Sequence, residues 1–187
     1  MIYNKPILMI HEWKSEFFNI PIKKYENFIL RFDDGLYSQY LALDFLKKIN
    51  TTKIFFISTG IIQPENKIND ESIIPCNIAH ERARQGIFDN FMKWSHIAEI
   101  HNTPQCIVGG HGNFHLDLRN VKLRKRLDII KTELKMFDIF ENHNIQIRDF
   151  CFPYNYECEI YKAMLSEYGI LNFFGTPNEN RIAIEDF

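Results

Sequence analysis

The feature that most constrains the fold of this chain is an alternation between strand-length apolar runs and stretches with helical periodicity. The apolar runs cover residues 6–10, 27–32, 53–58, 105–108 and 147–152, with two further short ones at 170–174 and 181–184. Apolar residues at helical spacing lie between them, at 38–49, 87–98, 121–142 and 157–168. Parallel strands need long crossover connections, which are usually helices. The alternation therefore predicts an α/β fold whose parallel sheet has helices outside it, either open or closed into a barrel.

Chain length limits how complete such a barrel can be. The chain has 187 residues, and we expect a single domain over 1–187. A full eight-stranded (β/α) barrel typically needs ~250 residues, so a barrel here is shortened or incomplete. Residues 61–85 have no regular period, because Pro64, Pro75 and several Asn and Asp residues interrupt them. Long irregular segments are often lids or binding loops, and we expect an insertion or lid at about 61–103.

Charge and composition argue against several classes of partner. The formal net charge of −2 gives no electrostatic reason to expect binding to nucleic acid or to an anionic membrane. No apolar run approaches the ~18 residues that span a bilayer, and the run at 6–10 is shorter than the ~7–15 residues of a signal peptide. The four cysteines form no C-x-x-C pair and are expected to be reduced thiols. We therefore expect a cytoplasmic protein.

Polar side chains follow the predicted strands at the points where those strands end. In chain order they are His11, Asp33, Asp34, Thr59, His111, His115 and Tyr154. The carboxyl ends of parallel strands share one rim of the sheet, and sites in α/β proteins are usually built there. We therefore expect these side chains to converge on one pocket, although they lie up to about 140 positions apart in the chain.

The acidic pair and the two histidines allow more than one interpretation. An Asp-Asp-Gly between a strand and a helix is, by itself, more often a turn or a helix cap. His111 and His115 have the H-x₃-H spacing of a metal pair, and one added carboxylate gives the composition of an open catalytic zinc site. The second carboxylate can then take a proton from the metal-bound water. A non-haem iron oxygenase also uses two histidines and a carboxylate, but it predicts a β-rich fold and gives Asp33 no role.

Three motifs resemble those of a known family. Residues 32–35 (Phe-Asp-Asp-Gly), 111–115 (His-Gly-Asn-Phe-His) and 152–154 (Phe-Pro-Tyr) look like the first three motifs of the polysaccharide deacetylases. This is the NodB-homology group, carbohydrate esterase family 4. The motifs occur in the family's order with comparable spacing, and the resemblance spans roughly residues 6–175. It implies a distorted, incomplete (β/α) barrel with parallel strands, which agrees with the alternation described above.

The resemblance also implies a reaction and roles for single residues. The reaction is hydrolysis of an N-acetyl group, or less often another acyl group, from a sugar. Asp33 would be the general base, and Asp34, His111 and His115 would bind a divalent metal, with Zn²⁺ the expected ion. The backbone N–H of Tyr154 would help to stabilise the oxyanion. We also expect substrate contacts from three further residues at the rim, which are His11, Thr59 and Pro153.

Several features of the family are missing. Cys151 stands where the third motif usually carries an arginine, and Asn155 replaces the usual glycine. The family's late motifs, an Asp/Trp pair and a Leu-x-His whose histidine protonates the leaving amine, have no counterpart, since no histidine follows His143 and no tryptophan follows Trp94. The general acid is therefore unassigned. The candidates, each with a surface or capping role as the alternative, are His11, His80, His96 and His101.

Two hypotheses about function follow. The first is a metal-dependent deacetylase that acts on an N-acetylated sugar, nucleotide-linked or lipid-linked, in surface-polysaccharide biosynthesis. The second is a non-catalytic descendant of the same fold, which binds a metal or a carbohydrate but has lost the acid. Metal content and acetate release, measured together, separate the two.

Overall fold

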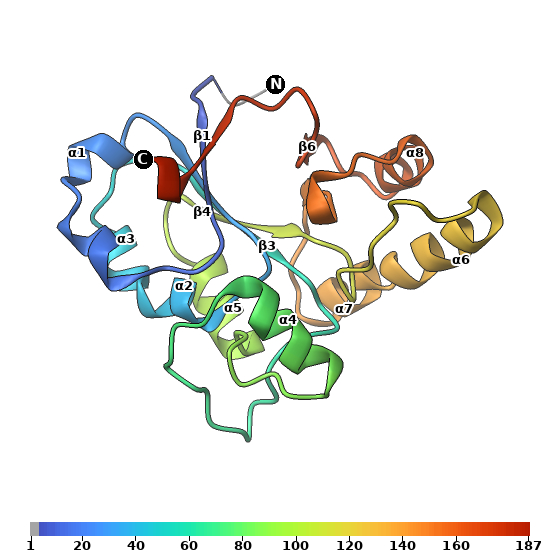
Figure 1. Ribbon diagram of the computed structural model, residues 1–187, viewed down its shortest axis with the longest axis horizontal. Coiled ribbons are helices and arrows are strands. Elements are labelled where there is room, and N and C mark those ends of the chain that lie inside the picture. The colour runs from blue at the N-terminus through green and yellow to red at the C-terminus, as the bar shows by residue number, and fades with distance from the viewer. Residues whose placement is uncertain (1–3) are drawn as a thin grey trace.

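Within residues 4–187, which the computed structural model describes, seven parallel strands form one curled sheet. The strands are β1 (Ile7–Ile10), β2 (Ile29–Phe32), β3 (Lys53–Ile57), β4 (Cys106–Gly110), β5 (Asp149–Cys151), β6 (Asn172–Phe174) and β7 (Arg181–Ala183). Their order in the sheet is β6-β5-β4-β3-β2-β1-β7, and each neighbouring pair is parallel. The sheet curls into a half-barrel with the helices around it (Figure 1). The predicted fold, a distorted and incomplete (β/α) barrel, is confirmed.

Helices connect most of the consecutive strands. The longer ones are α4 (Cys76–Arg84), α5 (Trp94–His101), α6 (Leu123–Glu133), α7 (Met136–Asn142) and α8 (Glu159–Glu167). The short ones are η1 (Ser15–Asn19), α1 (Ile22–Tyr25), α2 (Tyr37–Leu41), α3 (Leu43–Leu46), η2 (Pro153–Asn155) and η3 (Ile184–Asp186). No helix in the part of the chain that the structure describes combines the length and the apolar character needed to cross a bilayer.

Two of the predicted helices are interrupted. The stretch 38–49 forms α2 and α3, and the stretch 121–142 forms α6 and α7. At both breaks the backbone tightens: the N–H of Phe45 donates to Ala42, and that of Phe137 to Leu134, three residues back instead of four. The apolar periodicity continues across each break, which is why the sequence pattern predicts one helix where the structure has two.

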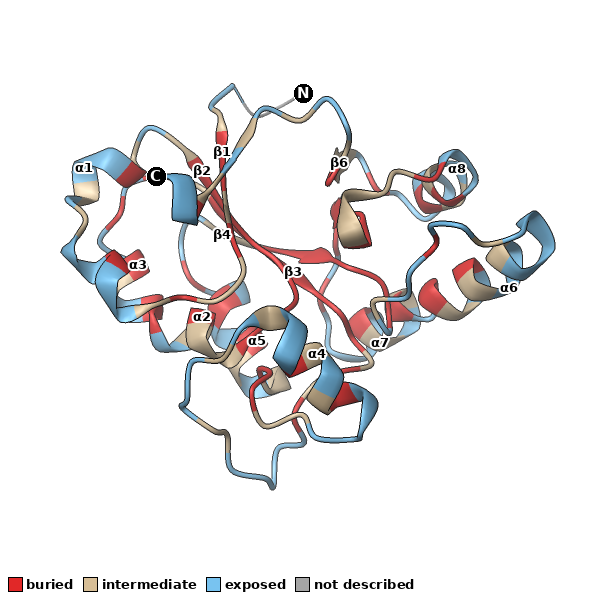
Figure 2. Cartoon of the chain, viewed as in Figure 1, coloured by how far each residue is buried: buried red, intermediate tan, exposed pale blue. Residues whose placement is uncertain are grey.

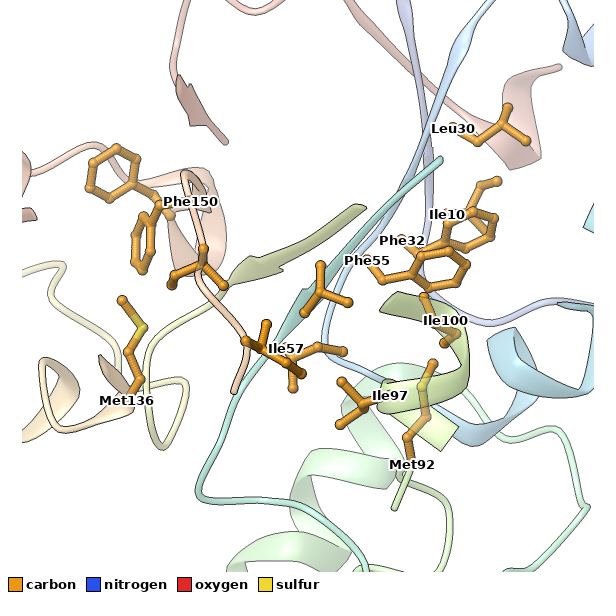
Figure 3. Close-up of a cluster of buried hydrophobic side chains, with 14 of the residues drawn as sticks. Ile10, Leu30, Phe32, Phe55, Ile57, Met92, Ile97, Ile100, Met136 and Phe150 are labelled. Carbon is orange, nitrogen blue, oxygen red and sulfur yellow. The ribbon is translucent and has the colours of Figure 1, made fainter. Parts of the chain in front are cut away.

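The core lies between the sheet and its surrounding helices. Buried side chains of β1, β2 and β3, such as Leu8, Phe32 and Phe55, pack against Ile97 and Ile100 of α5. Figure 3 shows this cluster, and the Phe32 and Phe55 rings stack with their centroids 4.5 Å apart. Figure 2 shows the central strands β2 and β3 as buried, whereas α6 and α8 each have an exposed side. The sheet is therefore a rigid support for residues at its rim.

The segment predicted as an insertion or lid, at about 61–103, contains two parts that pack differently. Residues 94–101 form α5, whose Ile97 and Ile100 lie in the main core, so this helix is the ordinary crossover between β3 and β4. The extra part, residues 61–93, is hereafter called the excursion and carries α4 (green in Figure 1). The expected helix over 87–98 starts only at Trp94, because Phe91 instead forms a β-bridge with Leu36. This β-bridge attaches the excursion to the segment that follows the acidic pair.

Candidate metal and catalytic site

Residues from the ends of four strands line a single cavity of about 470 Å³. The cavity lies at the carboxyl ends of β1, β2, β4 and β5, and residues of α4 complete its wall. The predicted site residues on its lining are His11, Asp33, Asp34, His111, His115 and Tyr154. The parallel sheet therefore brings together residues that are remote in sequence, as the strand-end argument predicts.

Three imidazoles approach one carboxylate oxygen in this cavity. Asp34 Oδ1 lies 3.3 Å from His111 Nε2 and 3.3 Å from His115 Nε2. His80 Nε2, from α4, lies 3.2 Å from the same oxygen. Ligands on a tetrahedral zinc ion with bonds of about 2.0–2.1 Å lie about 3.3–3.4 Å apart, so each of the three distances to Asp34 Oδ1 matches the spacing of two metal ligands. Among the described residues, Asp34 Oδ1 and His80 Nε2 are buried and take part in no hydrogen bond of ordinary geometry, so both atoms are available to a cation.

The electrostatics of this cluster suit a cation. Burial alone would raise the pKa of Asp34, but His115, His111 and His80 lower it well below its usual range. Burial lowers the pKa of His115 to about 3, so its imidazole is neutral and its nitrogen lone pair is available. His111 differs: burial alone would lower its pKa, but Cys151 and Asp34 raise it well above the ordinary value, so a cation there must displace a proton. A carboxylate and imidazoles that have lost this proton are the donor set of catalytic zinc sites. The residues present therefore fit a divalent metal.

Further contacts fix the loop formed by residues 111–115, hereafter called the histidine loop. His111 Nδ1 lies 2.7 Å from the carbonyl oxygen of Cys151, which directs Nε2 of the same ring toward Asp34. Glu133, buried on α6, accepts the backbone N–H groups of Asn113 and Phe114, both at 3.0 Å. Gly112 has φ +80°, and a Cβ there would lie 2.1 Å from a Glu133 oxygen. The glycine in the motif is therefore required both by its backbone angle and by its neighbour.

Asp33 has a different environment from Asp34. Its Oδ2 accepts a hydrogen bond of 2.6 Å from Arg31 Nη2, and Arg31 is itself fully buried and paired with Glu179. Burial opposes ionisation of Asp33, but the charges of Arg31 and His111 lower its pKa below the ordinary value. Asp33 Oδ1 has no hydrogen-bond partner within residues 4–187. One oxygen is thus held in place and the other is free to accept a proton.

The backbone around the cavity is in an unusual conformation. Asp34, His115, Tyr154 and Asn155 all have positive φ, at 75°, 54°, 58° and 50°. Such angles are uncommon outside glycine and tend to cluster at functional sites. Asparagine tolerates this region better than most residues, so Asn155 can replace the glycine that the resembling family carries there. Its Oδ1 also accepts a hydrogen bond from Arg31 Nη2 at 3.1 Å.

The remaining predicted residues divide into two groups. His11 lines the cavity, whereas Thr59 is buried and its hydroxyl donates to Asn113 Oδ1 at 2.9 Å. Pro153 is buried at the start of η2. The structure therefore places Thr59 and Pro153 behind the cavity lining, where they support the histidine loop and the Tyr154 turn.

Two of the four candidate proton donors line the cavity, and the other two do not. His11 and His80 line the cavity. The His96 ring instead stacks on Tyr40 with centroids 4.1 Å apart, and His101 is exposed at the end of α5.

Two residues of the site have no signal strong enough to assign them from sequence. His80 lies in an irregular segment, and nothing in the sequence distinguishes it from His96 and His101 of the same insertion as a candidate acid. Arg31 looks like an ordinary strand residue, although a charged residue inside an apolar run is a hint that a buried partner exists.

Comparison with known proteins defines the fold. No sequence-family model and no curated protein sequence matches the chain. Among solved structures, IcaB from Ammonifex degensii has a TM-score of 0.63 at 18% identity, covering 95% of this chain and 89% of that chain. A de-N-acetylase from Aggregatibacter actinomycetemcomitans has a TM-score of 0.63 at 13% identity, covering 96% and 93%. The deacetylase domain of BpsB from Bordetella bronchiseptica has a TM-score of 0.62 at 14% identity, covering 96% and 94%. The chain therefore has the NodB-like fold of the polysaccharide deacetylases.

Proposed function

We propose that the protein is a metal-dependent hydrolase that removes an N-acetyl group from a sugar. The observation that carries this proposal is that the adjacent carboxylates of Asp33 and Asp34 have different surroundings. Asp34 faces the imidazoles that would hold a cation, whereas Asp33 is held by Arg31 and keeps Oδ1 free. Binding a metal needs only the carboxylate of Asp34, so the presence of Asp33 beside it supports a catalytic function for the site.

The residues of the chain have distinct roles in this reaction. A divalent cation, expected to be zinc, held by Asp34, His111 and His115 would supply Lewis acidity and make a water molecule easier to deprotonate. Asp33 accepts the proton of the attacking water at Oδ1. Arg31 keeps Asp33 ionised and fixes its orientation. The backbone N–H of Tyr154, in the turn after β5, donates to the oxygen on which negative charge develops.

The leaving amine also needs a proton. We assign its donor to His11, which lines the cavity and whose ring nitrogen lies within 4.8 Å of a carboxylate oxygen of Asp34. His11→Gln should then lower turnover without releasing the metal.

The shape of the site supports a substrate larger than one sugar ring. A second cavity of about 450 Å³ adjoins the first, and both are lined by His80, Arg84, His115 and Tyr154. Ligand sites commonly measure ~300–1,000 Å³, so each cavity is large enough for a sugar unit or a group of similar size. We propose an N-acetylated sugar with an attached group, such as a nucleotide or lipid carrier or a second sugar, as used in surface-polysaccharide biosynthesis.

Acetate release from the zinc-loaded protein tests this function. The substrates are chitin oligomers and a nucleotide-linked N-acetylglucosamine, and metal content is measured on the same samples. Asp33→Asn should abolish acetate release while zinc stays bound, and His111→Ala should lose zinc. Asp44→Asn, on an exposed side chain of α3, is the matched control and should behave as wild type. Stoichiometric zinc without acetate from any substrate would favour the non-catalytic descendant, and equal loss of zinc in both variants would refute the roles given to Asp33 and His111.

A further inference from the structure

The excursion brings an additional histidine to the candidate metal site. His80 comes from α4, outside the three motifs on which the proposed function depends. Its side chain is 12% exposed, and its Nε2 faces Asp34 Oδ1 at 3.2 Å. One ligand atom each from Asp34, His80 and His115 can be chosen so that all three lie within 4.8 Å of one another. His80 therefore lies as close to Asp34 as the two motif histidines do.

Hydrogen bonding does not account for this convergence. A carboxylate oxygen accepts about two hydrogen bonds, yet three imidazole nitrogens lie at 3.2, 3.3 and 3.3 Å from Asp34 Oδ1. His80 Nε2 remains without a hydrogen-bond partner among the described residues. The His80 ring also stacks on the His115 ring, with centroids 4.4 Å apart. A cation bound by Asp34, His80 and His115, whose ligand atoms lie within 4.8 Å of one another, would satisfy these three at once.

Packing within the excursion holds His80 in this position. Ala79 and Ala83 of α4 are buried in a small core with Leu36, Ile61 and Phe91. The excursion is also bonded to the chain just after the acidic pair: the N–H of Met92 donates to Gly35 at 2.9 Å, and that of Tyr37 to Asn90 at 2.7 Å. The segment that carries His80 is thus attached to the segment that carries Asp34, which fixes their relative position.

We propose that His80 is a fourth protein ligand of the divalent cation, beside Asp34, His111 and His115, so that the attacking water would take a fifth position on the ion. This inference rests on the proposed function, because it takes the cation at Asp34 as given. The cation then connects α4 of the excursion to the strand ends of the barrel. Metal binding and the docking of α4 are consequently linked: the metal stabilises the docked excursion, and the docked excursion raises the affinity for the metal.

Zinc affinity, measured by competition with a chromophoric chelator, tests the ligand role. His80→Phe removes the nitrogen but keeps a ring that can stack on His115. It should bind zinc more than ~100-fold more weakly than wild type, since changes outside the ligand set already cost ~10–100-fold. His101→Ala, an exposed histidine on α5, is the control and should bind zinc as wild type does. Thermal unfolding of the metal-free proteins checks that each variant folds.

Hydrogen exchange of the wild-type protein gives a test that needs no variant. One equivalent of zinc should slow amide exchange in α4, and the same zinc should have no such effect in His80→Phe. Unchanged exchange in α4 of the wild type, or wild-type zinc affinity in His80→Phe, would overturn the inference and leave the proposed function intact. A wild-type protein that binds no zinc would overturn both.

Discussion

Arg31 Nη2 lies 2.6 Å from Asp33 Oδ2, so the proposed general base takes its cationic partner from two residues earlier on the same strand end. Side chains at positions i and i+2 of an extended chain point to the same side, which makes this pairing possible. Arg31 also contacts Glu179, from the segment before β7. Cys151 stands where the resembling family has its arginine, and Arg31 supplies a guanidinium at this site instead.

Loss of this guanidinium should strongly destabilise the protein. Arg31→Met leaves Asp33 buried without its cationic partner, whereas Glu179 keeps Arg181, and the loss should cost about 3–5 kcal/mol in the free energy of unfolding. Urea unfolding measures this value. Arg124→Met, on an exposed position of α6, is the control and should change stability little. An Arg31→Met protein as stable as wild type would show that the buried triad contributes nothing.

The same variant should reverse the pH dependence contributed by Asp33. In the wild type the pKa of Asp33 is lowered, so its contribution to stability is present above the unfolded pKa of 3.8 and is lost as pH falls. Without Arg31 the burial of Asp33 dominates and its folded pKa rises above the unfolded value. The contribution is then lost as pH rises. Unfolding at a series of pH values between about 2 and 7 distinguishes the two signs, because the wild-type loss lies mostly below about pH 4 and that of the variant above it.

Much of the site could be predicted from sequence, for a specific physical reason. Asp33 and Asp34 follow β2, and His111 follows β4, so a parallel sheet places them at one rim whatever the details of the connections. Strand-length apolar runs are the strongest local signal in this chain. The position of each motif relative to a strand end therefore carried most of the spatial information.

The contacts that could not be predicted come from outside that pattern. His80 reaches the site through the excursion, whose path depends on the β-bridge between Leu36 and Phe91 and on a small separate core. No periodicity indicates such a path. The pairing of Arg31 with Asp33 depends on full burial of a guanidinium inside the sheet, which strand propensity does not indicate. Tertiary packing, and not local sequence, determines both.

Glu133 gives a second pH-dependent prediction. Burial raises the pKa of Glu133 above its ordinary value of 4.5, so its stabilising contribution is present at low pH and is lost as pH rises. Glu133→Gln does not titrate. The difference in unfolding free energy between wild type and this variant should therefore decrease between about pH 4 and 7. For Glu141→Gln, on the exposed side of α7, it should stay constant. A difference that grows with pH would mean that the N–H groups of Asn113 and Phe114 outweigh burial.

Substitutions of Asn155 test how this chain accommodates an asparagine where the resembling family carries a glycine. With φ at 50°, an alanine should be strained by roughly 1–2 kcal/mol, whereas a glycine is not. Asn155→Ala should therefore be less stable than Asn155→Gly in thermal unfolding. Asn144, with φ at 57° at the end of α7, is the matched position. Because Asn155 accepts a hydrogen bond from Arg31, Asn155→Gly should cost about 1.5–3 kcal/mol more than Asn144→Gly. Equal costs at the two positions would leave that hydrogen bond without a role in stability.

A comparison of alanine substitutions at Gly112 and Gly86 separates the cost of backbone strain from that of a steric clash at the histidine loop. Both have φ +80°, but a Cβ at Gly112 would meet Glu133 Oε2 at 2.1 Å, and one at Gly86 would meet nothing within 4 Å. Gly86→Ala should cost about 1–2 kcal/mol of unfolding free energy, which is the strain of the left-handed backbone alone. Gly112→Ala should cost more, because Glu133 must move and release the N–H groups of Asn113 and Phe114. Since these bonds hold the loop between His111 and His115, Gly112→Ala should also weaken zinc binding, and Gly86→Ala should not. Equal effects of the two substitutions on zinc affinity would show that Glu133 does not position the metal ligands.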